Sequence, residues 1–134
     1  MIKANPSVVF LCVHNAGRSQ MAAGFMRALS GGQIDVFSGG SEPASQVNRV
    51  AIEAMAEKGI NIGSYQPRKW ADDELRQADV IVTMGCGDEC PFYPGKRYLD
   101  WELADPAGKP LAEVRPIRDD IERRVRILVH ELGV

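Results

Sequence analysis

The stretch VVFLCVHNAGRSQM, residues 8–21, constrains the fold more than any other, because an unbroken apolar run passes directly into a small, polar loop. Residues 8–13 are apolar throughout and rich in valine, as expected of a strand covered on both faces of a parallel sheet. From Ser19 onward the apolar side chains recur at helical spacing, with Ser19 as the expected cap and Gly31-Gly32 as the end. The order of strand, loop and helix is typical of an α/β fold.

The rest of the chain repeats this alternation. Further strands are expected at 34–40 (IDVFSGG), 79–84 (DVIVTM) and 96–100 (KRYLD). Helices are expected over 47–55, closed by Gly59, over the short polar stretch 72–78, and over a C-terminal amphipathic segment with Pro116 near its start. Strands that alternate with helices predict a parallel sheet with right-handed connections and helices on both faces.

Length and charge narrow the functional classes. The 134 residues fit one domain, residues 1–134, and 16 basic against 18 acidic side chains give a net charge of −2. No basic excess argues for nucleic acid or an anionic membrane, and no apolar run approaches the ~18 residues of a membrane span. We therefore expect a soluble, cytoplasmic monomer whose affinity for anions, if any, is local.

Cys12 stands at the carboxyl end of the first expected strand, where open α/β sheets bind ligands. The backbone amides of the loop, the positive end of the following helix and the Arg18 guanidinium together predict a nest for a tetrahedral oxyanion. The same field stabilises a thiolate, which makes Cys12 a candidate nucleophile that Ser19 is placed to assist with a hydrogen bond. The oxyanion-binding candidates are Val13, His14, Asn15, Ala16, Gly17, Arg18 and Ser19. The alternative is a buried, inert Cys12 beside a surface Arg18.

The loop resembles the phosphate-binding loop of the low-molecular-weight protein tyrosine phosphatases, and more closely that of the arsenate reductases built on the same fold. The stretches SGGSEPA, VTMGCGDECP and WELADPAG extend the resemblance over essentially the whole chain. The resemblance implies a single-domain flavodoxin-like three-layer sandwich with a four-stranded parallel sheet. It also implies that Cys12 is the nucleophile, Arg18 the oxyanion clamp and Asp105 the acid.

The cysteines separate the two activities. A phosphatase clears its covalent intermediate with water, whereas reduction of arsenate needs a second thiol to attack the Cys12 sulfur. The resemblance implies a relay from Cys12 to a Cys12–Cys86 disulfide and then to a Cys86–Cys90 disulfide, which external thioredoxin opens without a bound cofactor. If residues 86–90 were helical, their cysteine Cβ atoms would lie about 5–6 Å apart, beyond the roughly 3.5–4.5 Å of a disulfide, so the segment would have to loosen.

Other functions stay open. One is a phosphatase that hydrolyses phosphomonoesters through a Cys12 thiophosphate, but Gln20 stands where phosphatases usually have proline, and no tyrosine lies near Asp105. A small bare oxyanion, arsenate with phosphate or sulfate as competitors, fits better. A mycothiol and mycoredoxin system is an alternative to thioredoxin, and a redox sensor without turnover is another. Cys86 and Cys90 lack the second Cys/His pair of a zinc site, so no metal is expected.

Overall fold

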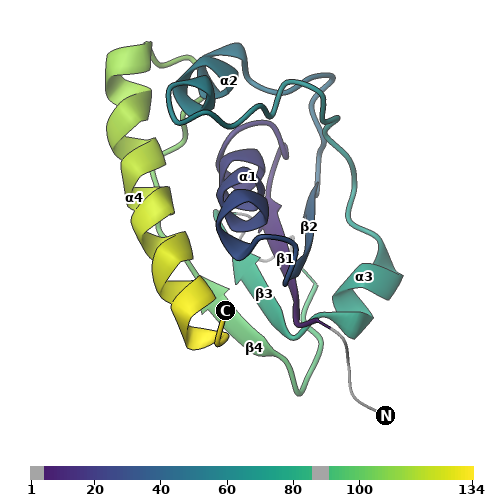
Figure 1. Ribbon diagram of the computed structural model, residues 1–134. Helices are drawn as coiled ribbons and strands as arrows, with labels where there is room; N and C mark the ends of the chain where they lie inside the picture. The colour runs from purple at the N-terminus through teal and green to yellow at the C-terminus, as the bar shows by residue number, and fades with distance from the viewer. Residues whose placement is uncertain (1–4, 86–90) are drawn as a thin grey trace.

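The computed structural model describes residues 5–85 and 91–134 (Figure 1). One parallel sheet has the strand order β2-β1-β3-β4, as the resemblance implied. The strands are β1 (Ser7–Cys12), β2 (Asp35–Gly40), β3 (Val80–Thr83) and β4 (Arg97–Asp100). The helices are α1 (Arg18–Ser30), α2 (Arg49–Ala56), α3 (Asp72–Gln77) and α4 (Leu111–Glu131). The predicted α/β class and the parallel arrangement are confirmed.

The central strand β1 divides the core into two clusters. Side chains alternate along a strand, so Val8, Phe10 and Cys12 face the side that α1, α2 and α4 cover, while Val9 and Leu11 face the other side. Figure 1 shows those three helices gathered on one side of the sheet and α3 on the other. All six residues of β1 are buried, as expected of a strand covered on both faces.

Two helix starts differ from the sequence expectation. Ser19 is not the cap of α1, because the cap position is Gly17. Ser19 is the second helical residue, and its side chain contacts the Cys12 sulfur. Helix α4 begins at Leu111, so Pro116 lies inside the helix and leaves the Ala112 carbonyl without its usual donor. The end of α1 is as expected, because Gly31 adopts the left-handed conformation there. No helix in residues 5–85 or 91–134 combines the length and apolar character needed to cross a bilayer.

A charged network joins α2 to α4 on the outer side of the larger cluster. Glu57, which caps the C-terminus of α2, accepts hydrogen bonds from Arg115 at 2.7 Å and from the buried Arg118 at 2.6 Å. Arg118 also donates to the Ala54 carbonyl at 2.9 Å. The hydrogen bonds from Arg115 and Arg118 lower the pKa of Glu57 from 4.5 to about 2. The ionised Glu57 carboxylate therefore favours the folded state.

We expect Glu57→Gln to reduce the free energy of unfolding most above pH 5. Because the folded pKa of Glu57 lies below the unfolded one, its contribution is fully present above pH 4.5 and is lost as the pH falls toward 2. Urea unfolding of wild type and variant between pH 7 and pH 2.5 measures the difference. Glu53→Gln, a change at an exposed site on the same helix, is the matched control. A difference that stays constant down to the lowest pH would contradict the assignment.

Candidate active site

The loop between Cys12 and Arg18 turns its carbonyl groups toward residues 42–48. The three bonds run from Glu42 N–H to Val13 O at 2.8 Å, from Ala44 N–H to His14 O at 3.0 Å, and from Asn48 N–H to Ala16 O at 2.8 Å. In a trans peptide the N–H points opposite to the C=O, and the described residues contain no cis bond. The amides that follow these carbonyls therefore point away from residues 42–48, into the loop, where an anion can accept their hydrogen bonds.

Asn15 braces this loop from within. It is fully buried, and its φ of 51° places it in the left-handed region that asparagine tolerates better than most residues. The backbone N–H of Arg68 donates to Asn15 Oδ1 at 3.0 Å, which identifies that atom as the oxygen of the amide. The amide nitrogen then faces Ser19 and donates to its Oγ at 2.7 Å.

This arrangement leaves the Ser19 hydroxyl proton for Cys12. Ser19 Oγ lies 2.9 Å from Cys12 Sγ and accepts a hydrogen bond from Asn15; because a Cys12 thiolate has no proton, the Ser19 hydroxyl is the donor to it. The donors thus run in one direction, from Asn15 to Ser19 to Cys12. A hydrogen bond of this kind stabilises the thiolate more than the thiol, which suits Cys12 to nucleophilic attack.

Arg18 lies between the end of β3 and the loop after β4. Its side chain is 11% exposed, and its Nη1 donates to the Leu103 carbonyl at 3.5 Å. Gly85 has a φ of +88°, and a Cβ at this position would lie 2.5 Å from Arg18 Nη1. Glycine at position 85 therefore permits both the backbone conformation and the close approach of the guanidinium.

Asp105 reaches the same place from the loop after β4. Its Oδ2 lies 3.7 Å from Arg18 Nη2, its Oδ1 accepts from the Ala107 amide at 3.0 Å, and its side chain is 52% exposed. The next residue, Pro106, packs on the loop so closely that a Cβ at Gly17 would lie 2.6 Å from Pro106 Cγ. The exposed carboxyl of Asp105 is thus held at the edge of the anion nest.

These residues surround one pocket of about 240 Å³. It is lined by Cys12, His14, Ala16, Gly17, Arg18, Ala44, Asn48, Asp105, Pro106 and Ala107. The volume is below the roughly 300 Å³ at which pockets for drug-sized ligands begin, so a small anion suits it. No phenylalanine, tyrosine or tryptophan is among these lining side chains, and the one aromatic ring, that of His14, is anchored by its Nδ1 to the Glu42 carbonyl at 2.9 Å.

Cys86 and Cys90 lie outside the described residues. The expected loosening of residues 86–90 and the disulfide steps therefore stay predictions. Within the described ranges no three His, Cys, Asp or Glu side chains gather as a metal site.

Two residues of the loop's support were missed by sequence reasoning. Gln20, noted only as a departure from proline, is 1% exposed and its Nε2 donates to the Asn15 carbonyl at 3.1 Å and to Asn15 Oδ1 at 3.2 Å. Arg68 holds Asn15 through its backbone, and its guanidinium donates to Ser38 O at 3.2 Å and Glu74 at 2.8 Å. The unusual polar residue directly after Ser19 was a signal for Gln20, whereas nothing near Arg68 in the chain marks its contact.

Gly40 is a third support, at the end of β2. A Cβ there would lie 2.5 Å from the Val13 carbonyl and 3.0 Å from the Asn15 amide nitrogen. The paired glycines in SGGSEPA were a usable signal, because a strand that ends in two glycines suggests close approach of another backbone.

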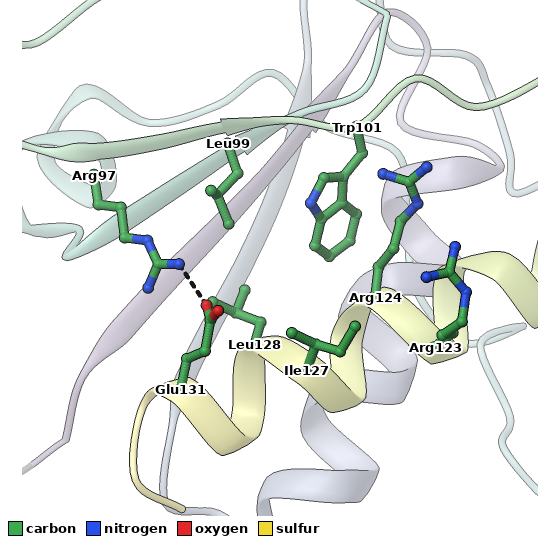
Figure 2. A pocket seen from close by; sticks show the side chains of 8 residues that line it. All are labelled: Arg97, Leu99, Trp101, Arg123, Arg124, Ile127, Leu128 and Glu131. Carbon is green, nitrogen blue, oxygen red and sulfur yellow. Dashed lines mark hydrogen bonds and ion pairs between the residues drawn. The ribbon is translucent and has the colours of Figure 1, made fainter.

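A second cavity, of about 320 Å³, lies between β4 and α4 (Figure 2). Leu99, Trp101 and Leu128 form its apolar part, and the ion pair between Arg97 and Glu131 closes one end. No thiol or hydroxyl is among its lining side chains, so it offers no counterpart of Cys12.

We expect Ser19→Ala to slow alkylation of Cys12 by iodoacetamide at pH 7 by about tenfold, since a hydrogen bond to a charged group contributes roughly 1.5–3 kcal/mol. Site-resolved mass spectrometry separates Cys12 from the other two cysteines. Ser7→Ala is the matched control, because it removes a hydroxyl that donates to the Gln77 carbonyl at 3.0 Å at the opposite end of β1. Equal alkylation rates in both variants would show that Ser19 does not activate Cys12.

Comparison with known proteins gives three consistent findings. The model of the family described as low molecular weight phosphotyrosine protein phosphatase matches residues 7–134. A putative arsenate reductase of Halobacterium salinarum is 39% identical over 129 residues, covering 92% of this chain and 91% of that protein. Among solved structures, a thioredoxin-dependent arsenate reductase of Corynebacterium glutamicum superposes with a TM-score of 0.86 at 41% identity.

The coverage differs between these relatives. The match to the Corynebacterium protein includes 99% of this chain but 64% of the other, so the chain spans less than two thirds of that relative's length. An arsenate reductase in its phosphate-binding state matches with a TM-score of 0.85 at 33% identity, over 95% of this chain and 98% of the other.

Proposed function

The chain belongs to the low molecular weight phosphotyrosine protein phosphatase family, and from that premise we propose that it reduces arsenate to arsenite with Cys12 as the nucleophile. The observation that carries the proposal is the directed chain of donors, from Asn15 through Ser19 to the Cys12 sulfur, inside a pocket sized for a small oxyanion. The relatives named as arsenate reductases support the same reaction.

In the first step the inward amides of the loop and Arg18 bind arsenate, and the Cys12 thiolate attacks arsenic. An S–As bond forms and one As–O bond breaks. The departing oxygen takes protons and leaves as water, and Asp105 is the acid beside it. Its position within 3.7 Å of Arg18 suits this role, because the oxyanion that Arg18 clamps comes within reach of the Asp105 carboxyl.

In the second step the Cys86 thiolate attacks the Cys12 sulfur. The S–As bond breaks with its electron pair remaining on arsenic, so As(V) becomes As(III), arsenite leaves and a Cys12–Cys86 disulfide forms. Cys90 then attacks the Cys86 sulfur and releases the Cys12 thiolate. Thioredoxin supplies two electrons to open the Cys86–Cys90 disulfide. Such a cycle needs a compartment that keeps thiols reduced, so we place the protein in the cytoplasm.

A phosphatase remains the second candidate, because its first step uses the same nest and the same nucleophile. The loop geometry does not separate the two. The pocket favours the reductase, since no phenylalanine, tyrosine or tryptophan is present among its lining residues to stack against an aryl phosphate. With a mycothiol-based reductant the roles of Cys12 and Arg18 in the first step would be the same, and only the reduction of the oxidised enzyme would differ.

We expect arsenate-dependent NADPH oxidation when the enzyme is coupled to thioredoxin and thioredoxin reductase. Cys12→Ser removes all activity because no S–As bond forms, and Cys86→Ser blocks arsenite release. Cys90→Ser permits one turnover but little cycling. Arsenite formed in single turnover and NADPH consumed in steady state are both measured.

Hydrolysis of p-nitrophenyl phosphate is measured in parallel with arsenate reduction. Phosphatase turnover that survives Cys86→Ser, without arsenite formation by the wild type, would make the protein a phosphatase. Turnover with mycothiol and mycoredoxin but not with thioredoxin would show that mycothiol, and not thioredoxin, is the reductant. Arsenate binding without either reaction would favour a redox sensor.

We expect Asp105→Asn to lower kcat for arsenate by about 10²-fold with little change in arsenate affinity, because general acids typically contribute 10²–10⁴-fold. Steady-state arsenite formation at saturating arsenate and thioredoxin gives kcat, and protection of Cys12 from alkylation by arsenate gives the affinity. Asp73→Asn, at an exposed site on α3, serves as the control. A variant with unchanged kcat would remove Asp105 from the mechanism.

A further inference from the structure

Phe92 is the most exposed of the large apolar side chains in the described residues. Its exposed fraction is 72%, compared with 50% for Ile127 and 38% for Tyr65. It stands two positions after Cys90 in the sequence. Exposure of a phenyl ring to water is unfavourable in free energy, and burial of the ring against a partner protein would be favourable.

The Phe92 ring is held in its exposed position by β4. It stacks on Tyr98 with the ring centroids 4.8 Å apart and the planes at 24°. The Tyr98 hydroxyl accepts a hydrogen bond from the Tyr93 amide at 2.6 Å and donates to the Pro91 carbonyl at 3.4 Å. Tyr98 therefore contacts the segment 91–93 at all three residues.

A second anchor joins the same segment to α3. The Tyr93 hydroxyl donates to Asp72 Oδ1 at 2.9 Å. That hydrogen bond raises the pKa of Tyr93, so the phenol remains a donor at neutral pH. With anchors on both β4 and α3, the exposed ring is a preorganised feature, and binding to it costs little ordering entropy.

This ring lies on the more thinly covered face of the sheet. Tyr98 and Tyr93 pack against the smaller cluster, whose buried members include Leu11 and Ile81. Of the helices described, only the six-residue α3 contributes a buried residue to this cluster, whereas α1, α2 and α4 cover the other face (Figure 1). A protein that approaches from this side meets the exposed Phe92 ring and one short helix rather than a layer of three helices.

We propose that the Phe92 ring, held by Tyr98, is a docking contact for thioredoxin on the oxidised enzyme, an inference that rests on the proposed function. Consecutive Cα atoms are 3.8 Å apart, so the Cα atoms of Cys90 and Phe92 are separated by at most about 7.6 Å. A protein whose sulfur bonds to Cys90 therefore binds the chain two residues from Phe92. Aromatic side chains that become buried at the centre of an interface often dominate its affinity.

The exchange balances in atoms and electrons. One thiolate of thioredoxin attacks a sulfur of the Cys86–Cys90 disulfide, which forms a mixed disulfide and releases the other cysteine as a thiolate. The second thiolate of thioredoxin then attacks the thioredoxin sulfur of the mixed disulfide, which closes the thioredoxin disulfide and releases the remaining cysteine of the enzyme as a thiolate. Thioredoxin loses two electrons, and Cys86 and Cys90 gain them and take up two protons. Phe92 contributes to the lifetime of the complex and not to bond breaking.

The test compares Phe92→Ala with Ile127→Ala, which truncates an exposed apolar side chain on α4. Steady-state rates at saturating arsenate give KM for thioredoxin, and single-turnover arsenite formation without thioredoxin reports on the arsenate chemistry alone. We expect Phe92→Ala to raise KM for thioredoxin about tenfold, with single-turnover arsenite formation and dithiothreitol-driven cycling unchanged. Ile127→Ala leaves all three values unchanged, and Phe92→Tyr restores KM for thioredoxin.

The outcomes separate the two proposals. If the wild type forms no arsenite in single turnover, the proposed function fails. If it forms arsenite and Phe92→Ala leaves KM for thioredoxin unchanged, the reductase stands and the docking contact is wrong. A loss of self-association in Phe92→Ala, by sedimentation, together with an unchanged KM would assign the ring to a second copy of the chain instead. Tyr98→Phe, which keeps the stacked ring but removes both hydroxyl bonds, is expected to raise KM by a smaller factor.

Discussion

The orientation of one buried amide sets the chemistry of the site. The Arg68 backbone N–H can only donate, so it requires the oxygen of Asn15 to face it and leaves the Asn15 nitrogen facing Ser19. The Ser19 proton can then point to the sulfur of a Cys12 thiolate, at the end of a chain of uncharged donors. Because all three side chains are buried, a reversal of the amide would leave unpaired polar atoms, which is costly away from water. The packing of these neutral groups thus adds a positioned donor to the field of Arg18 and the loop amides.

The parallel sheet explains why such distant residues meet. All four strands run in one direction, so their carboxyl ends share an edge, and the site gathers the residues that follow these ends. Cys12 ends β1, Gly40 ends β2, and Gly85 follows β3 within two residues of Thr83. The loop after β4 brings Asp105 to the same edge. Two of these positions, Gly40 and Gly85, are crowded by the Val13 carbonyl and by Arg18, and glycine is the residue that fits at both.

Sequence reasoning predicted what depends on short-range pattern. The strands, the helix that ends at Gly31, and the placement of Cys12 at a strand end follow from apolar periodicity and from the glycine stops. It failed where a contact is long-range or where two local rules compete. Serine is a residue type that often caps helices, but the Ser19 hydroxyl lies against Cys12 and the cap position is Gly17. Helix α4 extends a turn before Pro116 because Val114, fully buried, continues the apolar stripe. Arg68 acts through its backbone, which no pattern of side chains reveals.

The contact between Gly17 and Pro106 has an evolutionary consequence. Any side chain at position 17 would overlap the proline ring, with its first carbon 2.6 Å from Pro106 Cγ, so the loop that carries Asp105 would have to retreat. A larger residue in the anion loop and a smaller one after the acid are therefore expected to be inherited together, since each change alone disturbs the distance between nucleophile and proton donor. The effects of substitutions at these two positions, 89 residues apart in the chain, are therefore expected to be non-additive.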